Sequence, residues 1–209
     1  MSILPVLSLL ETRVVGVLVE KQHTVPDTYP LTLNSLVSGC NQKTSRDPVI
    51  EATEAEVQAV VDRLRALSLV VESSGGRVMR YAHNAGKVLN VPGQSVAILA
   101  VLFLRGPQTP GELRINCERL HRFADLSAVE GFLQELAARP AGALVVQLAR
   151  LPGARETRWA HLLSGTPENN VPAEPAVSLP ESTALEARVA RLEAEVTELR
   201  AALDKLRLQ

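Results

Sequence analysis

The sequence predicts a mainly α-helical α+β fold in which a group of helices followed by a β-hairpin occurs twice, with a coiled-coil helix after it. Three observations lead to this prediction. Helix-capping boxes open several apolar runs that have helical spacing. Two pairs of short β-branched runs flank turn residues. A heptad pattern of Leu and Val occupies the end of the sequence.

Helix starts are marked by capping boxes. In this motif a Ser or Thr is followed three residues later by Glu, and each side chain bonds a free backbone N–H at the other position. The boxes are Ser8/Glu11, Thr53/Glu56, Thr109/Glu112, Ser127/Glu130 and Thr183/Glu186. Pro110 follows Thr109, and proline is favoured at the first helical position. We expect each box to begin a helix.

The first repeat contains three predicted helices, over residues 8–22, 31–39 and 53–67. Two β-branched runs, residues 69–73 and 77–83, then surround the pair Gly75-Gly76 and predict a hairpin.

The second repeat has the same order. Helices are predicted over residues 95–105, 110–120 and 127–138. A strand over residues 144–148 and a return strand over residues 158–162 flank the turn Pro152-Gly153. Alternation in the first of these strands predicts that Leu144, Val146 and Leu148 face inward.

Three helices followed by a hairpin is the order of a winged-helix domain, a variant of the helix-turn-helix. We therefore expect two tandem winged-helix domains, residues 1–90 and 91–165, which match in element order and spacing but not in residue identity. The first carries about 13 extra residues before its third helix, which we place within residues 23–30 or 40–48.

Beyond the second domain, residues 166–182 contain four prolines and predict an extended linker. Residues 183–209 predict a coiled coil with Val or Leu at position a and Leu at position d, a pattern that favours parallel homodimers. The dimerisation residues are Leu185, Val189, Leu192, Val196, Leu199, Leu203 and Leu206. The alternative is an amphipathic helix that packs on its own protein.

Charge and composition limit the function classes. Residues 1–90 are neutral overall, residues 91–165 carry a net charge of +2, and residues 166–209 carry −3. No segment has the strong basic bias of an avid DNA-binding protein. The longest apolar run, residues 96–104, is shorter than the roughly 20 residues that span a membrane. With no secretory leader, and with Cys40 and Cys117 expected as packed free thiols, we expect a cytoplasmic protein.

No catalytic or metal-binding motif is visible. The four histidines, His23, His83, His121 and His161, lack metal-ligand spacing with Cys, Asp or Glu. The run around Gly75-Gly76 lacks the Lys and the following helix of a phosphate-binding loop. We expect no enzyme activity, no metal and no cofactor.

Several segments resemble the YceH family of uncharacterised bacterial proteins. They include Glu11-x-Arg13-Val14, Glu20-Lys21-Gln22, Cys40-Asn41-Gln42-Lys43, Arg46-x-Pro48 and the most specific run, Arg105-Gly106-x-Gln108-Thr109-Pro110-Gly111-Glu112. The resemblance covers about residues 7–165 and implies tandem winged-helix domains, but no established ligand or reaction. Ser45 departs from the pattern, which has Asn before Arg46.

Two partner classes stay open, double-stranded DNA bound by a dimeric regulator and a protein bound by an adaptor. Arginines near the hairpins and a polar cluster before the third helix suit phosphate oxygens. The candidate contact residues for either partner are Asn41, Gln42, Lys43, Arg46, Arg77, Arg80, Arg114, Arg155 and Arg158. The third helices, which would enter the major groove, begin with carboxylates and favour the protein partner.

Overall fold

The computed structural model describes residues 6–73, 76, 78–150, 152–153 and 155–167. These residues belong to one compact unit, residues 1–170, and a second unit covers Val171–Gln209. The predicted coiled coil, its heptad positions and the capping box Thr183/Glu186 lie outside the described residues. We call residues 6–90 the first half and residues 91–167 the second half.

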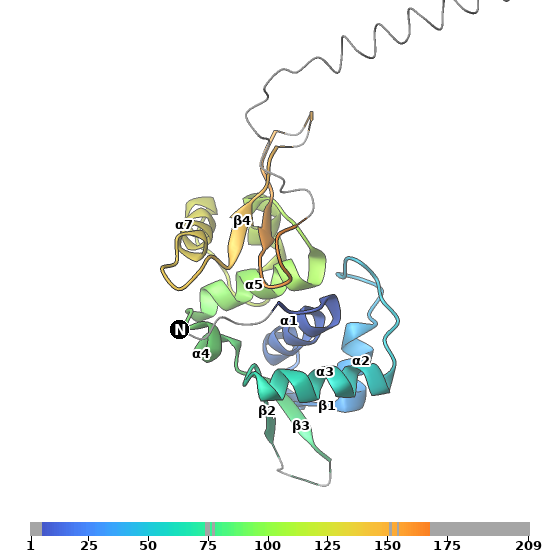
Figure 1. The fold of residues 1–209 in the computed structure, drawn as a ribbon. Coiled ribbons are helices and arrows are strands. Elements are labelled where there is room, and N and C mark those ends of the chain that lie inside the picture. The colour runs from blue at the N-terminus through green and yellow to red at the C-terminus, as the bar shows by residue number, and fades with distance from the viewer. Residues whose placement is uncertain (1–5, 74–75, 77, 151, 154, 168–209) are drawn as a thin grey trace, which may run out of the picture. The chain divides into compact units, whose positions relative to one another are not determined.

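The described residues form a mixed α+β fold of short helices and two small antiparallel sheets (Figure 1). The elements of the first half are α1 (Leu9–Thr24), the 3-10 helix η1 (Pro26–Thr28), β1 (Leu31–Thr32), α2 (Leu33–Cys40), α3 (Glu54–Ala66), β2 (Val70–Ser73), β3 (Arg80–His83) and α4 (Ala85–Leu89). Those of the second half are α5 (Gly93–Arg105), α6 (Pro110–Asn116), α7 (Leu126–Ala137), β4 (Val145–Gln147) and β5 (Trp159–His161). Among the helices of this part of the chain, none has the length and apolar character that crossing a membrane requires.

The two halves share a strand framework down to its register. In the first half, Val70 pairs with His83 and Val71 with Ala82; in the second, Val145 pairs with His161 and Val146 with Ala160. The sequence Arg-aromatic-Ala-His occurs at the last strand of each half. Residues 80–83 form β3, and residues 158–161 are Arg158 followed by β5. Our expectation that the halves match without residue identity was therefore wrong for this tetrad.

The two halves also share a pairing on the other edge of their last strand. β1 pairs with β3 and makes the sheet order β1-β3-β2. At the matching place in the second half, Gln108 forms an isolated bridge with Trp159, through backbone hydrogen bonds of 3.0 and 2.7 Å. The shared order of elements in each half is therefore a helix, a short strand or bridge, two helices and two strands.

Three of the predicted capping boxes are confirmed, those at Ser8, Thr53 and Thr109. The box at Ser127 was wrong, because Asp125 caps α7 instead. Its carboxylate accepts from the backbone N–H of Ala128 at 2.8 Å and from the hydroxyl of Ser127 at 2.7 Å. Asp is as good a cap as Ser, so α7 begins before the predicted residue.

Other differences have local causes. Residues 31–32 form β1 rather than the first turn of a helix, and α4 was not predicted. The inward alternation predicted for the first strand of the second hairpin was correct for Leu148, which is buried, but wrong at its centre, since Val145 is buried and Val146 is half-buried. Because the two valines are adjacent and both apolar, a period-two pattern does not determine which of them faces the core.

The core is built around the contact between α1 and α5, the most extensive between any two helices of the described residues (Figure 1). Both helices are buried on every side for much of their length, over residues 11–19 and 95–104. Gly16 allows the close approach, because a Cβ there would lie 3.0 Å from the Leu104 side chain and 3.2 Å from Cβ of Phe103. Buried residues of both halves consequently form one continuous cluster.

The close approach at Gly16 leads to a stability prediction. We expect Gly16→Val to destabilise the protein by about 1–3 kcal/mol, the usual cost of forcing extra carbon atoms into a filled core. Gly131 on α7 is the matched control, because it is exposed and a Cβ there would meet nothing within 4 Å. Gly131→Ala should instead stabilise by up to about 1 kcal/mol through helix propensity.

Urea denaturation of the full chain, followed by circular dichroism, measures both effects. Equal stability of the Gly16→Val variant and the wild type would contradict the assignment of Gly16 as the contact that sets the distance between the two helices.

Candidate functional site

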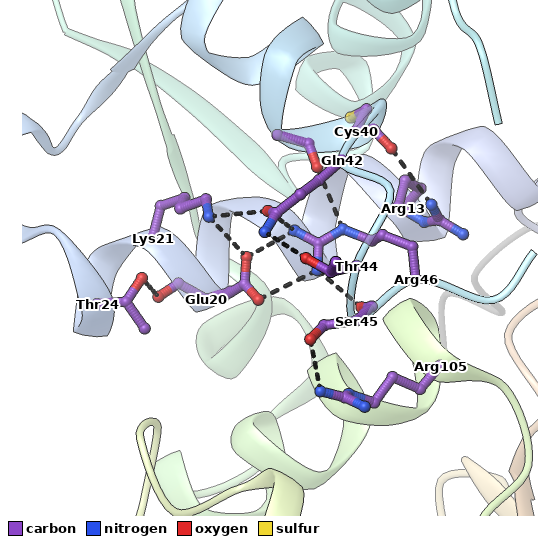
Figure 2. A network of polar contacts seen from close by, with 11 residues as sticks. Arg13, Glu20, Lys21, Thr24, Cys40, Gln42, Thr44, Ser45, Arg46 and Arg105 are labelled. Carbon is purple, nitrogen blue, oxygen red and sulfur yellow. Dashed lines mark hydrogen bonds and ion pairs between the residues drawn. The ribbon is translucent and has the colours of Figure 1, made fainter. Parts of the chain in front are cut away.

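The polar cluster predicted as a contact surface, residues 41–46, turns inward around a buried arginine (Figure 2). The Arg46 side chain is 0% exposed. Its guanidinium donates to both carboxylate oxygens of Glu20, at 3.1 and 2.6 Å, and to Oε1 of Gln42 at 3.0 Å. It also donates to the carbonyl oxygens of Gly39 and Ser45, at 3.2 and 2.8 Å. The N–H donors of Arg46 that could otherwise bind a phosphate are therefore already paired with acceptors inside the protein.

The partner carboxylate stays ionised. Glu20 also lies 3.0 Å from Nζ of Lys21. Burial by itself would raise the pKa of Glu20, but the hydrogen bond and charge of Arg46, with the charge of Lys21, bring that pKa below its ordinary value. The pair is therefore an internal ion pair that holds the loop against α1.

A second buried arginine and an asparagine fix the two ends of the loop. Arg13, on α1, donates to the carbonyl oxygens of Cys40 and Pro48, at 3.3 and 2.6 Å. Burial lowers the pKa of Arg13, and repulsion from the charge of Arg46 lowers it further. Asn41 closes the loop, since its amide donates to the carbonyl of Ala52 at 2.8 Å and accepts from the same residue's N–H at 2.7 Å.

The same loop reaches the second half. Arg105, at the end of α5, donates to the hydroxyl of Ser45 at 2.7 Å (Figure 2). The N–H of Asp47 donates to the carbonyl of Leu104 at 2.8 Å. Ser45 has a φ of 59°, a left-handed conformation that Asn adopts more readily than Ser. Lys43 is exposed. The loop is thus a bridge between the halves, and Lys43 is the member of the cluster that carries an exposed charge.

The third helices, α3 and α7, bury matching faces and expose acidic ones. Both bury aliphatic residues with the spacing i, i+4, i+7: Val57, Val61 and Leu64 in α3, Val129, Leu133 and Leu136 in α7. Exposed carboxylates follow, Glu54, Glu56 and Asp62 in α3 and Glu130 and Glu135 in α7. No Lys or Arg lies in the first two turns of either helix.

The cations near α3 are engaged by protein groups. Arg63 lies 3.0 Å from Glu11, and Arg65 lies 2.7 Å from Glu72. Arg80, on β3, donates to the carbonyl oxygens of Thr28 and Pro30 at 3.1 and 2.8 Å. Arg77 lies outside the described residues.

The arginines of the second half have a different environment. Every ion pair found among the described residues lies in the first half. Arg114 is exposed and donates to the carbonyl of Ala124 at 3.3 Å, Arg155 is exposed, and Arg158 is half-buried. The structure therefore separates the candidate residues into an internal set, around Arg46, and a set of arginines that have no carboxylate partner within the described ranges.

The two thiols are core groups, and two of the histidines, His83 and His161, are half-buried. Cys40 and Cys117 are free and buried, as predicted, and burial raises the pKa of each to about 12. Nε2 of His83 donates a hydrogen bond to Oε1 of Gln22, and His161 packs edge-to-face on Phe103 at 4.9 Å. In the part of the chain that the structure describes, no group of three or more His, Cys, Asp and Glu side chains could hold a metal ion.

Sequence reasoning grouped the polar cluster correctly but missed its partners, Glu20 and Arg13. The available signal was their position on a helix that is otherwise apolar, because a charged residue in a buried helix needs an internal partner.

The buried ion pair leads to a prediction. Arg46→Ala leaves Glu20 without its main partner and should cost about 3–5 kcal/mol of stability. Arg46→Lys keeps the charge but loses the paired hydrogen bonds, so its stability should be intermediate. Lys43→Ala, in the same loop but exposed, should change stability by no more than about 0.5 kcal/mol. A denaturation series in which Arg46→Ala costs no more than Lys43→Ala would contradict the internal role.

The half-buried histidines His83 and His161 predict acid sensitivity. Burial, assisted at His83 by the charge of His23, lowers the pKa of His83 and of His161 from 6.5 to about 4. Folding therefore favours the neutral rings, and the unfolded chain binds more protons below pH 6.5. Stability should be complete above pH 6.5 and fall as the pH falls toward 4, by about 1.4 kcal/mol per pH unit for each histidine.

Denaturation midpoints between pH 6.5 and 5 test this, because ordinary carboxyl groups titrate lower, near 4.5. His161→Gln should roughly halve the slope. A slope unchanged by that substitution would show that His161 does not titrate on unfolding.

Comparison with known proteins gives the family. Residues 7–154 match the family described as "Protein of unknown function, DUF480". The chain is 62% identical over 202 residues to a UPF0502 protein of Dechloromonas aromatica (strain RCB), covering 95% of each chain. It is 62% identical over 200 residues to the UPF0502 protein Mpe_A1449 of Methylibium petroleiphilum, with 92% of this chain and 85% of the relative covered. A UPF0502 protein of Leptothrix cholodnii is 65% identical over 156 residues, 75% of this chain and 70% of the relative. The chain therefore belongs to the DUF480 family of proteins of unknown function.

Proposed function

We propose that each half is a winged-helix unit and that the protein is a non-catalytic regulator that binds double-stranded DNA through its second half. The element order supports the fold assignment, since helix, strand, helix, helix and hairpin is the arrangement of a winged helix. The shared register of the two hairpins supports a tandem arrangement. In such a unit α7 would enter the major groove and the β4–β5 hairpin would be the wing.

One observation carries the choice of the second half: its arginines have no carboxylate partner among the described residues, whereas those near α3 do. Arg105 and Arg139 donate to Ser45 and to the carbonyl oxygen of Leu89, and the other arginines of this half are Arg114, Arg119, Arg122, Arg150, Arg155 and Arg158. The last three follow β4 and so belong to the wing. Arginine binds phosphate oxygens through paired hydrogen bonds, and we assign the phosphate contacts to Arg155 and Arg158 in particular.

The exposed face of α7 has side chains that can read bases despite its charge. Gln134 can pair with adenine, Ser127 can bond to several bases, and Glu130 can accept from the amino group of cytosine. The wing arginines would offset the repulsion between these carboxylates and the phosphates. Affinity would then come from the wing and sequence preference from the helix.

The first half favours a second candidate function, a protein-binding adaptor. α3 exposes carboxylates and alanines, and its two arginines form ion pairs within the protein. Such a face would repel DNA and suits a basic protein surface. Arg46 has no part in either function, since it is buried in the internal network.

We also propose that the regulator is a homodimer joined by residues 183–209. The support is the sequence pattern alone, with Val189 and Val196 at position a and Leu192 and Leu199 at position d. Sedimentation of the full chain tests this state. We expect the wild type to sediment as a dimer and the variant with Leu192→Asp and Leu199→Asp to sediment as a monomer.

The DNA-binding prediction concerns the salt dependence of affinity. Full-length protein is titrated onto mixed genomic DNA fragments at several salt concentrations. We expect binding that persists at roughly 150 mM salt and a steep log–log slope. Replacing both Arg155 and Arg158 with Gln should reduce the magnitude of that slope by about 1.8, or about 0.9 for each phosphate that the protein no longer neutralises.

The matched control removes two exposed cations of the first half. Arg65→Gln with Lys87→Gln should leave the slope unchanged. Loss of slope in the control but not in the wing variant would overturn the assignment to the second half. Absence of binding at every salt concentration would reject DNA as the partner and leave the adaptor as the better proposal.

A further inference from the structure

The second half contains an open groove where α6 ends and the chain turns toward α7. Its volume is about 160 Å³, and it is lined by Arg114, Ile115, Glu118, Arg122 and Phe123. Arg114 and Arg122 were considered from the sequence as contacts for DNA, whereas Ile115, Glu118 and Phe123 were not.

The lining of the groove includes one aromatic side chain, Phe123, that is packed against neighbouring rings. Phe123 is 4% exposed, and its ring packs edge-to-face against His121 at 4.7 Å and Phe132 at 5.8 Å. Ile115, by contrast, is 71% exposed. An isoleucine left this open beside a supported aromatic ring provides apolar contact area that costs little ordering on binding.

The walls are positive. Arg114 is oriented by its hydrogen bond to the carbonyl of Ala124, at 3.3 Å. Arg122 is exposed, and neither arginine forms an ion pair within the described residues. Glu118 is the single carboxylate in the lining, so the lining has two positive charges and one negative. Hydrogen bonds from Ser127 and Ala128 lower the pKa of Asp125, and the charge of Arg114 lowers it further, so this carboxylate also faces Arg114 from outside the lining. A ligand with negative charge on both sides of an apolar group would match it.

The size of the groove decides between kinds of ligand. Sites for small molecules usually enclose about 300–1,000 Å³ and bury most of the ligand. A groove of about 160 Å³ open to solvent is too small for that, but it accommodates one protruding side chain. The exposed Ile115 also contributes nothing to a phosphate contact, which argues against DNA as the occupant of this groove.

We propose that this groove is a docking site for a protein segment in which a large apolar side chain is flanked by Asp or Glu. The apolar side chain packs between Ile115 and Phe123, and the carboxylates pair with Arg114 and Arg122. The proposal does not depend on DNA binding, because it assigns a different partner, and the phosphate contacts proposed above are assigned to Arg155 and Arg158 rather than to the groove.

A peptide selection tests the proposal. A random 12-residue phage library is panned on immobilised full-length protein and, in parallel, on a variant with Arg114→Glu and Arg122→Glu. We expect the wild type to enrich sequences with Leu, Phe or Ile between acidic residues, and the variant not to enrich them. A selected peptide, synthesised and labelled, should bind about tenfold more weakly to Ile115→Ser.

Controls separate the groove from general charge and from misfolding. Arg119→Glu removes a nearby exposed charge that does not line the groove and should keep peptide affinity within about twofold. Ile115→Ser changes an exposed side chain, and its denaturation midpoint should equal that of the wild type. Failure to enrich any acidic-apolar sequence, or equal enrichment on the Arg114→Glu/Arg122→Glu variant, would overturn the proposal.

The DNA titration distinguishes the two proposals. If Arg114→Glu with Arg122→Glu lowers the salt slope as much as the wing variant does, the groove belongs to a DNA surface and the docking proposal fails. An unchanged slope together with abolished peptide binding supports a separate protein site, whether or not the wing binds DNA.

Discussion

The contact between α1 and α5 is the constraint on which the rest of the structure depends. Each helix is buried nearly all round, so neither half could expose its first helix without opening a large apolar surface to water. Gly16 sets the distance of approach, and the sheets and the remaining helices pack around this pair. The two halves are for this reason not independent bodies. They form one core, although their strand frameworks repeat.

Burying α1 on every side creates a problem that the loop of residues 41–48 solves. Arg13 and Glu20 lie on α1, and a buried charge is costly unless it is paired. The loop provides carbonyl oxygens for Arg13 and an arginine for Glu20, and it also reaches the end of α5 through Ser45 and Asp47. The polar richness of this segment therefore satisfies groups inside the protein. The same donors, seen in the sequence alone, resemble a contact surface.

That difference shows which parts of the structure local sequence can predict. The helix order followed from capping boxes and apolar periodicity, which act within a few residues, and three caps were correct. The short strand β1 could not be predicted, because its existence depends on Tyr81, about 50 residues away. The burial of Arg46 likewise depends on Glu20, 26 residues earlier. The exposed arginines of the second half were predicted as candidates, but only the fold could separate them from the arginines that pair with carboxylates.

The repeat itself indicates where function resides. Residues that set the hairpin framework recur in both halves: paired valines opposite Ala and His, with an aromatic residue that joins the additional pairing. The halves differ in the loop before the third helix and in the distribution of exposed charge. Because the shared residues already account for the fold, the residues that differ between the halves can have other roles. In the first half they tie the loop to α1 and α5, while in the second they leave exposed arginines and a small groove at the surface. On this reasoning the differences in the first half account for internal contacts, and those in the second half are the basis of our proposals for binding.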